Sequence, residues 1–197
     1  VNSYRFGDWD FARLITAVAD VPGIERVRFT SPHPKDFPPS LLDAVLSHPN
    51  ICKQIHLPLQ SGSDRMLGLM NRTYTNKEYR ALVDRIRTLR SDIVLSTDII
   101  CGFCGESDAE FAETYRLVEE VRFHSAFIFK YSERKNTIAA RKFSDDVSEP
   151  VKTERVTRLF DLQRNISYER NREYLKTTVP VLVEGDAKRS AAQGMGK

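Results

Sequence analysis

Apolar segments of strand length alternate with amphipathic segments of helix length along this chain, and the alternation constrains the fold more than any other feature. The strand-like segments are residues 26–30, 51–59, 93–103 and 125–131. The helix-like segments are residues 11–18, 41–46, 63–70, 75–89 and 107–121. Strands joined by helices form parallel sheets with right-handed crossovers, so the sequence predicts an α/β fold, either an open sheet or a barrel. Four strands are too few to close an eight-stranded barrel.

Polar residues gather where the predicted strands end. The clearest case is the run QIHLPLQSGS at residues 54–63, which changes from an apolar strand to a glycine-containing helix start. The polar pairs at the strand ends are Ser31/His33, Gln60/Ser61, Gly102/Glu106 and Ser132/Arg134. In parallel α/β proteins these ends share one edge of the sheet, where ligands bind. A plain structural interpretation is also open, in which Gly62 makes the turn and Ser63 caps the helix.

The composition is that of a globular protein rather than of a membrane-spanning or disulfide-rich one. The 197 residues are 41% hydrophobic and carry a formal net charge of +3, which permits a nucleic-acid partner without requiring one. No apolar run reaches the roughly 18 residues of a membrane span, and residues 1–5 do not have the pattern of a signal peptide. Three cysteines argue against a disulfide framework and fit a reducing compartment.

Cys101 and Cys104 form a CxxC motif between a strand and a helix, and three interpretations are open. The helix start would lower the pKa of a thiol there, as in a thiol–disulfide oxidoreductase. Two cysteines are also half of a zinc site, but Cys52 has no partner at metal-ligand spacing, so we expect no metal site. The third interpretation is two buried apolar thiols.

Histidine and arginine residues near the strand ends are further candidates. His33 and His56 each fit a structural role or a direct chemical one. Arg134 and Lys135 follow a strand and fit either a carboxylate or phosphate site or a solvated loop. The sequence shows no Ser-His-Asp order, P-loop or paired carboxylates, so the catalytic residues are unknown at this point.

The strand-end motifs together resemble those of the MiaB-type radical S-adenosylmethionine methylthiotransferases. The motifs are VNSY at 1–4, RFTSPHP at 28–34, HLPLQSGS at 56–63, MNR at 70–72 with Thr75, STD at 96–98, GFCGE at 102–106, YS at 131–132 with Arg134 and Thr137, and VLVEG at 181–185. They run from end to end of the chain in the family's order. Residues 29–38, 50–58 and 102–106 are similar in particular to the mitochondrial branch, the cyclin-dependent-kinase regulatory-subunit-associated methylthiotransferase.

This resemblance implies the carboxyl-terminal portion of a partial, TIM-like (βα) radical SAM barrel. The residues then expected to bind S-adenosylmethionine are Ser31, His33, Gln60, Ser61, Asp98, Gly102 and Glu106, with Arg72 and Arg134 binding the substrate. Such a cofactor needs hydroxyl and carboxamide partners for its ribose, and arginine or backbone N–H groups for its carboxylate. Relatives have apolar residues or proline at the positions of Cys101 and Cys104, which supports the interpretation as buried thiols.

The implied activity converts N6-isopentenyladenosine at position 37 of tRNA to its 2-methylthio derivative. In that family a reduced 4Fe-4S cluster cleaves S-adenosylmethionine to a radical, a second 4Fe-4S cluster supplies sulfur, and flavodoxin or ferredoxin is the kind of electron donor expected. The family's CxxxCxxC cluster loop is absent from this chain, so the chain alone is expected to be inactive. The expected partner is tRNA rather than a membrane, in the bacterial cytoplasm or the mitochondrion.

The resemblance also divides the chain into parts. Residues 1–148 are expected to be the carboxyl-terminal part of the barrel, 149–176 a connecting helix, and 177–197 the start of a truncated TRAM domain, a small RNA-binding β module. We therefore expect a truncated piece of a longer protein, with a strand at residues 177–183. Three alternatives remain: the sibling ribosomal-protein methylthiotransferase, a thiol–disulfide oxidoreductase that uses Cys101 and Cys104, and an RNA-binding module.

Overall fold

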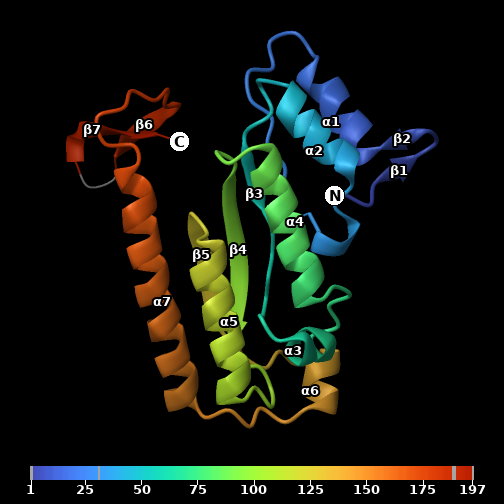
Figure 1. Ribbon diagram of the computed structural model, residues 1–197, viewed down its shortest axis with the longest axis vertical. Coiled ribbons are helices and arrows are strands. Elements are labelled where there is room, and N and C mark those ends of the chain that lie inside the picture. The colour runs from blue at the N-terminus through green and yellow to red at the C-terminus, as the bar shows by residue number, and fades with distance from the viewer. Residues whose placement is uncertain (1, 31, 188–189, 197) are drawn as a thin grey trace. The chain divides into compact units, whose positions relative to one another are not determined.

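A computed structural model of the chain describes residues 2–30, 32–187 and 190–196, and from residue 184 onward it describes the backbone (Figure 1). The chain divides into two compact units, Val1–Ser167 and Tyr168–Lys197. Their boundary lies within the long helix α7 (Glu149–Arg172). The domain boundaries predicted from the sequence at residues 148 and 176, in front of and behind that helix, stay a prediction.

The first unit is built on a parallel sheet of three strands in the order β3-β4-β5. The strands are β3 (Gln54–His56), β4 (Val94–Cys101) and β5 (Ser125–Lys130). A parallel bridge between Val27 and Ile51 lies outside these strands and marks a further parallel segment. The predicted α/β fold with a parallel sheet is confirmed.

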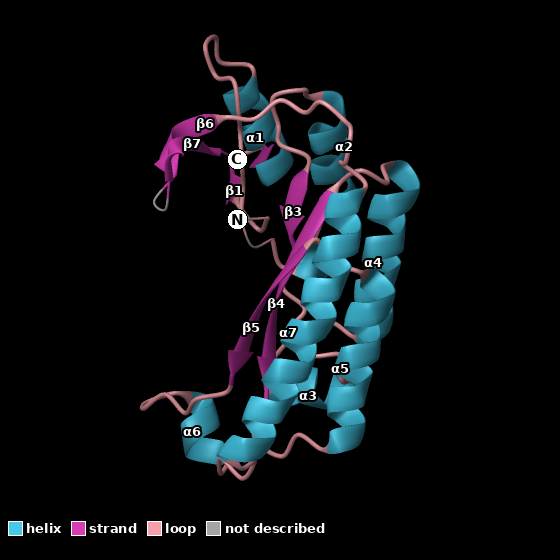
Figure 2. Cartoon of the chain, turned by 90° about the vertical axis from the view of Figure 1, so that its left-hand side faces the viewer, coloured by secondary structure: helices cyan, strands magenta, loops and turns pink. Residues whose placement is uncertain are grey.

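Helices α4 (Asn76–Leu89), α5 (Asp108–Val121) and α7 lie along one face of this sheet, as Figure 2 shows. The remaining elements of the unit are β1 (Arg5–Phe6), β2 (Trp9–Asp10), α1 (Phe11–Ala19), the 3-10 helix η1 (Pro34–Asp36), α2 (Pro39–Ser47), α3 (Asp64–Leu69) and α6 (Ile138–Lys142). Ser63 caps α3, and Thr75 and Ser107 begin complete capping boxes at α4 and α5. These caps confirm the predicted helix starts, whereas the β1–β2 hairpin and α6 were not predicted.

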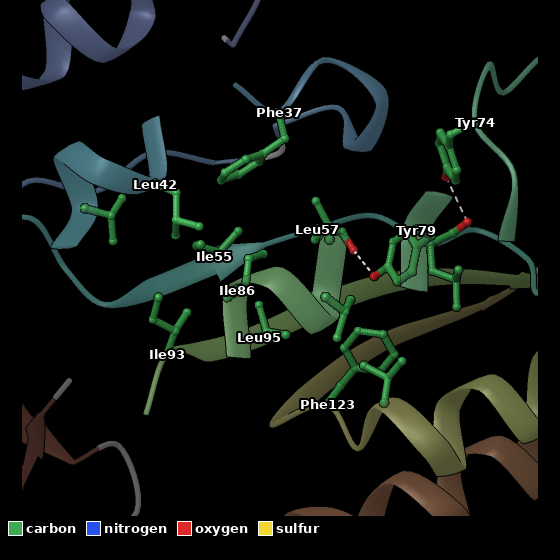
Figure 3. Close-up of a cluster of buried hydrophobic side chains, with 14 of the residues drawn as sticks. Phe37, Leu42, Ile55, Leu57, Tyr74, Tyr79, Ile86, Ile93, Leu95 and Phe123 are labelled. Carbon is green, nitrogen blue, oxygen red and sulfur yellow. Dashed lines mark hydrogen bonds between the residues drawn. The ribbon is translucent and has the colours of Figure 1, made fainter. Parts of the chain in front are cut away.

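The main hydrophobic core lies between the sheet and its helices, and Figure 3 shows part of it around Leu57 and Tyr79. Each large apolar side chain buried there stabilises the fold by roughly 1.5–3 kcal/mol. The hydroxyl of the fully buried Tyr79 donates to the Leu57 carbonyl at 2.8 Å. The hydroxyl of Tyr74 donates to the Leu59 carbonyl at 2.9 Å, and burial raises the pKa of Tyr74 to about 12.

These side-chain contacts explain why the strand predicted at residues 51–59 is only three residues long. The tyrosine hydroxyls occupy carbonyls that a longer ladder would use, and the Leu59 N–H donates to the Thr97 hydroxyl at 2.9 Å. Pro58 has no N–H to donate. The strand predicted at residues 26–30 was also too long, because only Val27 forms a bridge there. A run of apolar residues in the sequence does not show which backbone N–H and C=O groups will bond to side chains instead of to a neighbouring strand.

The second unit contains the end of α7 and an antiparallel pair of strands, β6 (Val183–Ala187) and β7 (Ser190–Gly196). The strand predicted at residues 177–183 was wrong, since residues 177–182 are irregular and β6 begins at Val183. Pro180 cannot donate to a ladder, which accounts for the late start. Assignment of this unit to a TRAM domain stays a prediction. Among the described helices, none combines the length and apolarity needed to cross a membrane.

Candidate functional site

Four of the residues expected at a ligand site line one pocket near the carboxyl ends of β4 and β5, and they are Gln60, Arg72, Asp98 and Arg134. We name this the rim pocket; its volume is about 570 Å³. The other lining residues are Ile100, Phe129, Lys130, Tyr131, Ser132, Thr137 and Ala139. The lining thus comes from the loop after β3, the end of β4, the end of β5 and the segment that follows β5.

Gln60 is fixed on the rim by its backbone. Its φ of 68° places it in the left-handed region, which few residues other than glycine adopt. Its N–H donates to the Asp98 carbonyl at 2.8 Å, and its carbonyl accepts from the Ile100 N–H at 2.9 Å. The residue is 6% exposed. Held against β4 in this way, Gln60 shows the backbone strain that often accompanies ligand sites.

Asp98 is the carboxylate of the rim-pocket lining, and it contacts His56, which is not itself among the lining residues. Its carboxylate lies 3.2 Å from Nε2 of His56, and Nδ1 of the same ring lies 3.0 Å from the Ser96 hydroxyl. His56 and Ser96 are partners in the β3–β4 register, and Asp98 lies two residues along the same face of the sheet. This histidine contact orients a carboxylate that can accept hydrogen bonds from ligand hydroxyl or ammonium groups.

Arg72 and Arg134 bring to the pocket two guanidinium groups with no acidic partner among the residues that the structure describes. Nε of Arg72 is buried and has no hydrogen-bond partner. A buried donor without a partner costs free energy, and a carboxylate or phosphate would satisfy it. The third cation of the lining, Lys130, is already paired with Glu149 at 2.8 Å. The arrangement therefore suits an anionic ligand group.

His33 lies near the rim pocket without lining it. Its N–H donates to the Asn2 side-chain oxygen at 2.9 Å, and the Asn2 amide donates to the His33 carbonyl at 2.9 Å. The ring packs edge-on against Tyr74. Burial lowers the pKa of His33, and the nearby charge of Asp36 partly offsets this lowering. Nδ1 of the ring is buried without a partner. Ser31, the other residue expected here, lies outside the described residues.

Ser61, Gly102 and Glu106, also expected to bind the cofactor, are not among the rim-pocket residues. The Ser61 hydroxyl is fully buried and lies 3.3 Å from the Thr114 hydroxyl of α5. The Glu106 carboxylate is buried, accepting from the Gly102 N–H at 2.7 Å and from Arg155 at 2.9 Å. These contacts hold the loop after β3 against α5 and the β4–α5 loop against α7. A direct contact of the three residues with a cofactor stays a prediction.

Two cations of α7, Lys152 and Arg155, were missed by sequence reasoning. Lys152 is 1% exposed, and its ammonium group pairs with Asp145 at 2.6 Å. Arg155 holds the β4–α5 loop through its pair with Glu106. A signal was present in the sequence, because both cations lie at helical spacing from the apolar, fully buried Leu159. Cations on the buried face of a helix indicate a specific carboxylate partner.

The three cysteines do not fit an iron–sulfur cluster. Cys101 and Cys104 are 1% and 4% exposed and belong to different apolar clusters. Burial raises the pKa of Cys101 to about 12 and also raises the pKa of Cys104, whereas redox pairs and cluster ligands need a stabilised thiolate. The described residues include no group of three or more His, Cys, Asp or Glu that could hold a metal ion. The geometry favours the interpretation as buried thiols over the oxidoreductase.

Alkylation of the native chain near neutral pH is expected to modify Cys52 and to spare Cys101 and Cys104. Cys52 is partly exposed, while the other two thiols are buried and stay protonated. Timed treatment with iodoacetamide followed by peptide mass spectrometry measures the three rates, and all three thiols should react in urea. A Cys52→Ser variant, expected to remain unlabelled when native, is the control. Fast native labelling of Cys101 would contradict the buried-thiol interpretation.

A model of the Radical SAM superfamily matches residues 4–118 of this chain. The chain belongs to the radical SAM superfamily. A solved structure supports the same fold: coproporphyrinogen III oxidase (HemN) from Escherichia coli, a radical SAM enzyme, superposes with a TM-score of 0.60 at 18% identity. The match covers 72% of this radical SAM chain and 32% of that protein. The expected fold class is thereby confirmed.

Curated relatives of this radical SAM chain carry the name tRNA-2-methylthio-N(6)-dimethylallyladenosine synthase. The relative from Chlorobium limicola is 48% identical over 199 residues, and the one from Porphyromonas gingivalis is 46% identical over 201 residues. Both alignments cover 100% of this chain but only 45% and 43% of the relatives. The chain thus spans about half the length of the curated relatives it matches.

Proposed function

We propose that this chain is the cofactor- and RNA-binding portion of a tRNA methylthiotransferase that makes the 2-methylthio derivative of N6-dimethylallyladenosine, the nucleoside also named N6-isopentenyladenosine. The rim pocket carries the proposal. In a radical SAM chain, polar residues that follow successive parallel strands line one pocket at the edge where α/β proteins bind ligands. The names of the relatives, which match the whole chain, supply the reaction and its substrate.

The residues present fit S-adenosylmethionine. Gln60 and Asp98 offer a carboxamide and a carboxylate to the ribose hydroxyls of the cofactor. Ile100 and Tyr131 supply an apolar wall for the adenine ring. When bound, S-adenosylmethionine supplies the radical chemistry for which the superfamily is named. The 4Fe-4S clusters of the complete enzyme would be held by residues outside this chain.

Arg134 is the proposed contact to the tRNA backbone. It lines the rim pocket and has no acidic partner among the described residues, so its planar guanidinium remains available to a phosphate. The electron donor, flavodoxin or ferredoxin, would act on the complete enzyme. The bacterial origin of the relatives favours the bacterial cytoplasm, and membership of the mitochondrial branch stays a prediction.

Addition of S-adenosylmethionine to the isotope-labelled chain tests the proposal by nuclear magnetic resonance. We expect the backbone N–H signals of Ile100, Tyr131 and Arg134 to shift, because these residues line the rim pocket. The Asp98→Asn variant should bind about 10- to 100-fold more weakly, the loss that follows from removing a hydrogen bond to a charged group. Chemical shifts followed over a titration give both affinities.

Asp84→Asn is the matched control, because Asp84 is an exposed carboxylate on α4 and is not among the rim-pocket residues. It should bind the cofactor as the unchanged chain does. Absence of any shift at millimolar S-adenosylmethionine would contradict the proposal. Shifts confined to α1 and α2 would do so as well, since neither helix contributes to the pocket lining.

A further inference from the structure

The face of the sheet opposite α4 and α5 carries two exposed phenylalanines. Phe127 and Phe129 are 56% and 53% exposed, and they are partners of Asp98 and Ile100 in the β4–β5 register, so all four side chains share that face. In the described part of the first unit no helix runs along this face of β4 and β5 (Figure 2). Two neighbouring exposed aromatic rings on one face of a sheet form an apolar patch, and such a patch marks a candidate interaction surface.

Phe129 is the ring that belongs to the rim pocket. Phe127 packs edge-on against His56, with ring centroids 5.9 Å apart. Phe129 lines the pocket with Arg72 and Arg134, and it is not among the rings that pack against another ring in the described part of the chain. One open aromatic face thus lies in the same pocket as two guanidinium groups without acidic partners.

We infer that Phe129 is a stacking platform for the target base, which enters the rim pocket extruded from its RNA loop with its flanking phosphates on Arg72 and Arg134. This inference rests on the proposed function and adds a substrate-binding residue to it. Aromatic rings beside cationic side chains are the common means of binding single-stranded nucleic acid, because every base has a π face and every nucleotide a phosphate. Exposed aromatic residues on an open sheet act in this way in RNA-recognition modules.

Charge favours an RNA base over a segment of protein as the occupant of this face. The rim pocket is lined by three cations and by a single carboxylate, that of Asp98. Lys130 is neutralised by Glu149, but Arg72 and Arg134 are not paired with acidic residues in the described chain. An apolar protein segment would leave both guanidinium groups unsatisfied. A nucleotide satisfies them with phosphate oxygens while its base covers the ring.

The experiment measures binding of this chain to two fluorescently labelled RNA hairpins by anisotropy. One hairpin has an unpaired adenosine in its loop, and the other has an abasic residue at that position and therefore the same phosphates. For the intact hairpin, Phe129→Ala should weaken binding about 5- to 150-fold, the range that loss of one base–aromatic stack implies. For the abasic hairpin, Phe129→Ala should change little, because no base remains to stack. Phe129→Trp should bind the intact hairpin as tightly as the unchanged chain.

Phe160→Ala is the matched control, since Phe160 is 50% exposed on α7 and is not among the rim-pocket residues. It should leave the affinity for both hairpins unchanged. The inference is overturned if Phe129→Ala weakens both hairpins equally, or weakens the intact one no more than Phe160→Ala does. Such a result leaves the proposed function standing, provided that S-adenosylmethionine still shifts the pocket signals. Failure of the unchanged chain to bind the intact hairpin overturns the inference and the RNA part of the proposed function together.

Discussion

Replacing Arg155 with methionine is expected to lower the free energy of unfolding by about 3–5 kcal/mol. The guanidinium pairs with Glu106 at 2.9 Å, and the side chain of Glu106 is only 1% exposed. Methionine keeps much of the packing volume but leaves a buried carboxylate without its counter-charge. Urea unfolding followed by circular dichroism measures the difference between the two chains.

Arg158→Met is the matched control for this experiment. Arg158 lies one turn along α7, its side chain is 53% exposed, and it pairs with the exposed Glu154 and lies over the Phe111 ring. That substitution should lower the stability by about 1 kcal/mol or less. Burial raises the pKa of Glu106 and Arg155 opposes the shift, so without Arg155 the carboxyl takes up a proton more readily. The loss in Arg155→Met should therefore shrink in acid, and a loss no larger than the control's at neutral pH would refute the prediction.

Acidification is expected to remove up to about 3 kcal/mol of stability through Glu110. A hydrogen bond from Arg65, the largest cause, lowers the pKa of Glu110 from 4.5 to about 2. A carboxyl with a lower pKa in the folded chain stabilises the fold above its unfolded pKa, and the contribution is lost as the pH falls through the folded value. The loss should thus begin near pH 4.5 and be complete near pH 2. Because Arg65 is half-exposed, salt should reduce the effect.

Urea unfolding of the unchanged chain and of Glu110→Gln at a series of pH values isolates this contribution. Between neutral pH and about pH 2 the variant should lose less stability than the unchanged chain, because glutamine does not titrate. Its amide can still form a hydrogen bond with Ser107. Glu149→Gln is the control, since Glu149 belongs to an exposed pair with Lys130 and water screens it. If Glu110→Gln and the unchanged chain lose stability in parallel as the pH falls, the assignment to Glu110 is wrong.

Local signals predicted much of the fold. The capping residues Ser63, Thr75 and Ser107 lie next to the groups they bind, so their helices could be placed from the sequence. The alternation of strands and helices predicted a parallel sheet, because that pattern leaves few other topologies. Gln60 and Arg134 could likewise be expected at one edge, since the ends of parallel strands share it.

Contacts between distant residues account for what the sequence did not predict. The short β3 depends on Tyr74 and Tyr79, which lie 15 and 22 residues along the chain from the carbonyls they bind. The burial of Glu106 depends on Arg155, 49 residues later in the chain. No local pattern specifies such a pairing, because an arginine on a helix pairs with whichever carboxylate the fold brings to it.

The sequence by itself determined the order of the elements, their caps and the polar character of the strand ends, because each of these depends on neighbours within a few residues. Only the tertiary structure decided which polar residues face a common pocket. Gln60 and Asp98 turn into it, whereas Ser61 turns toward α5 and Glu106 toward α7. The physical reason is that adjacent residues of an extended segment point to opposite sides, and the helices packed on the sheet decide which side is covered.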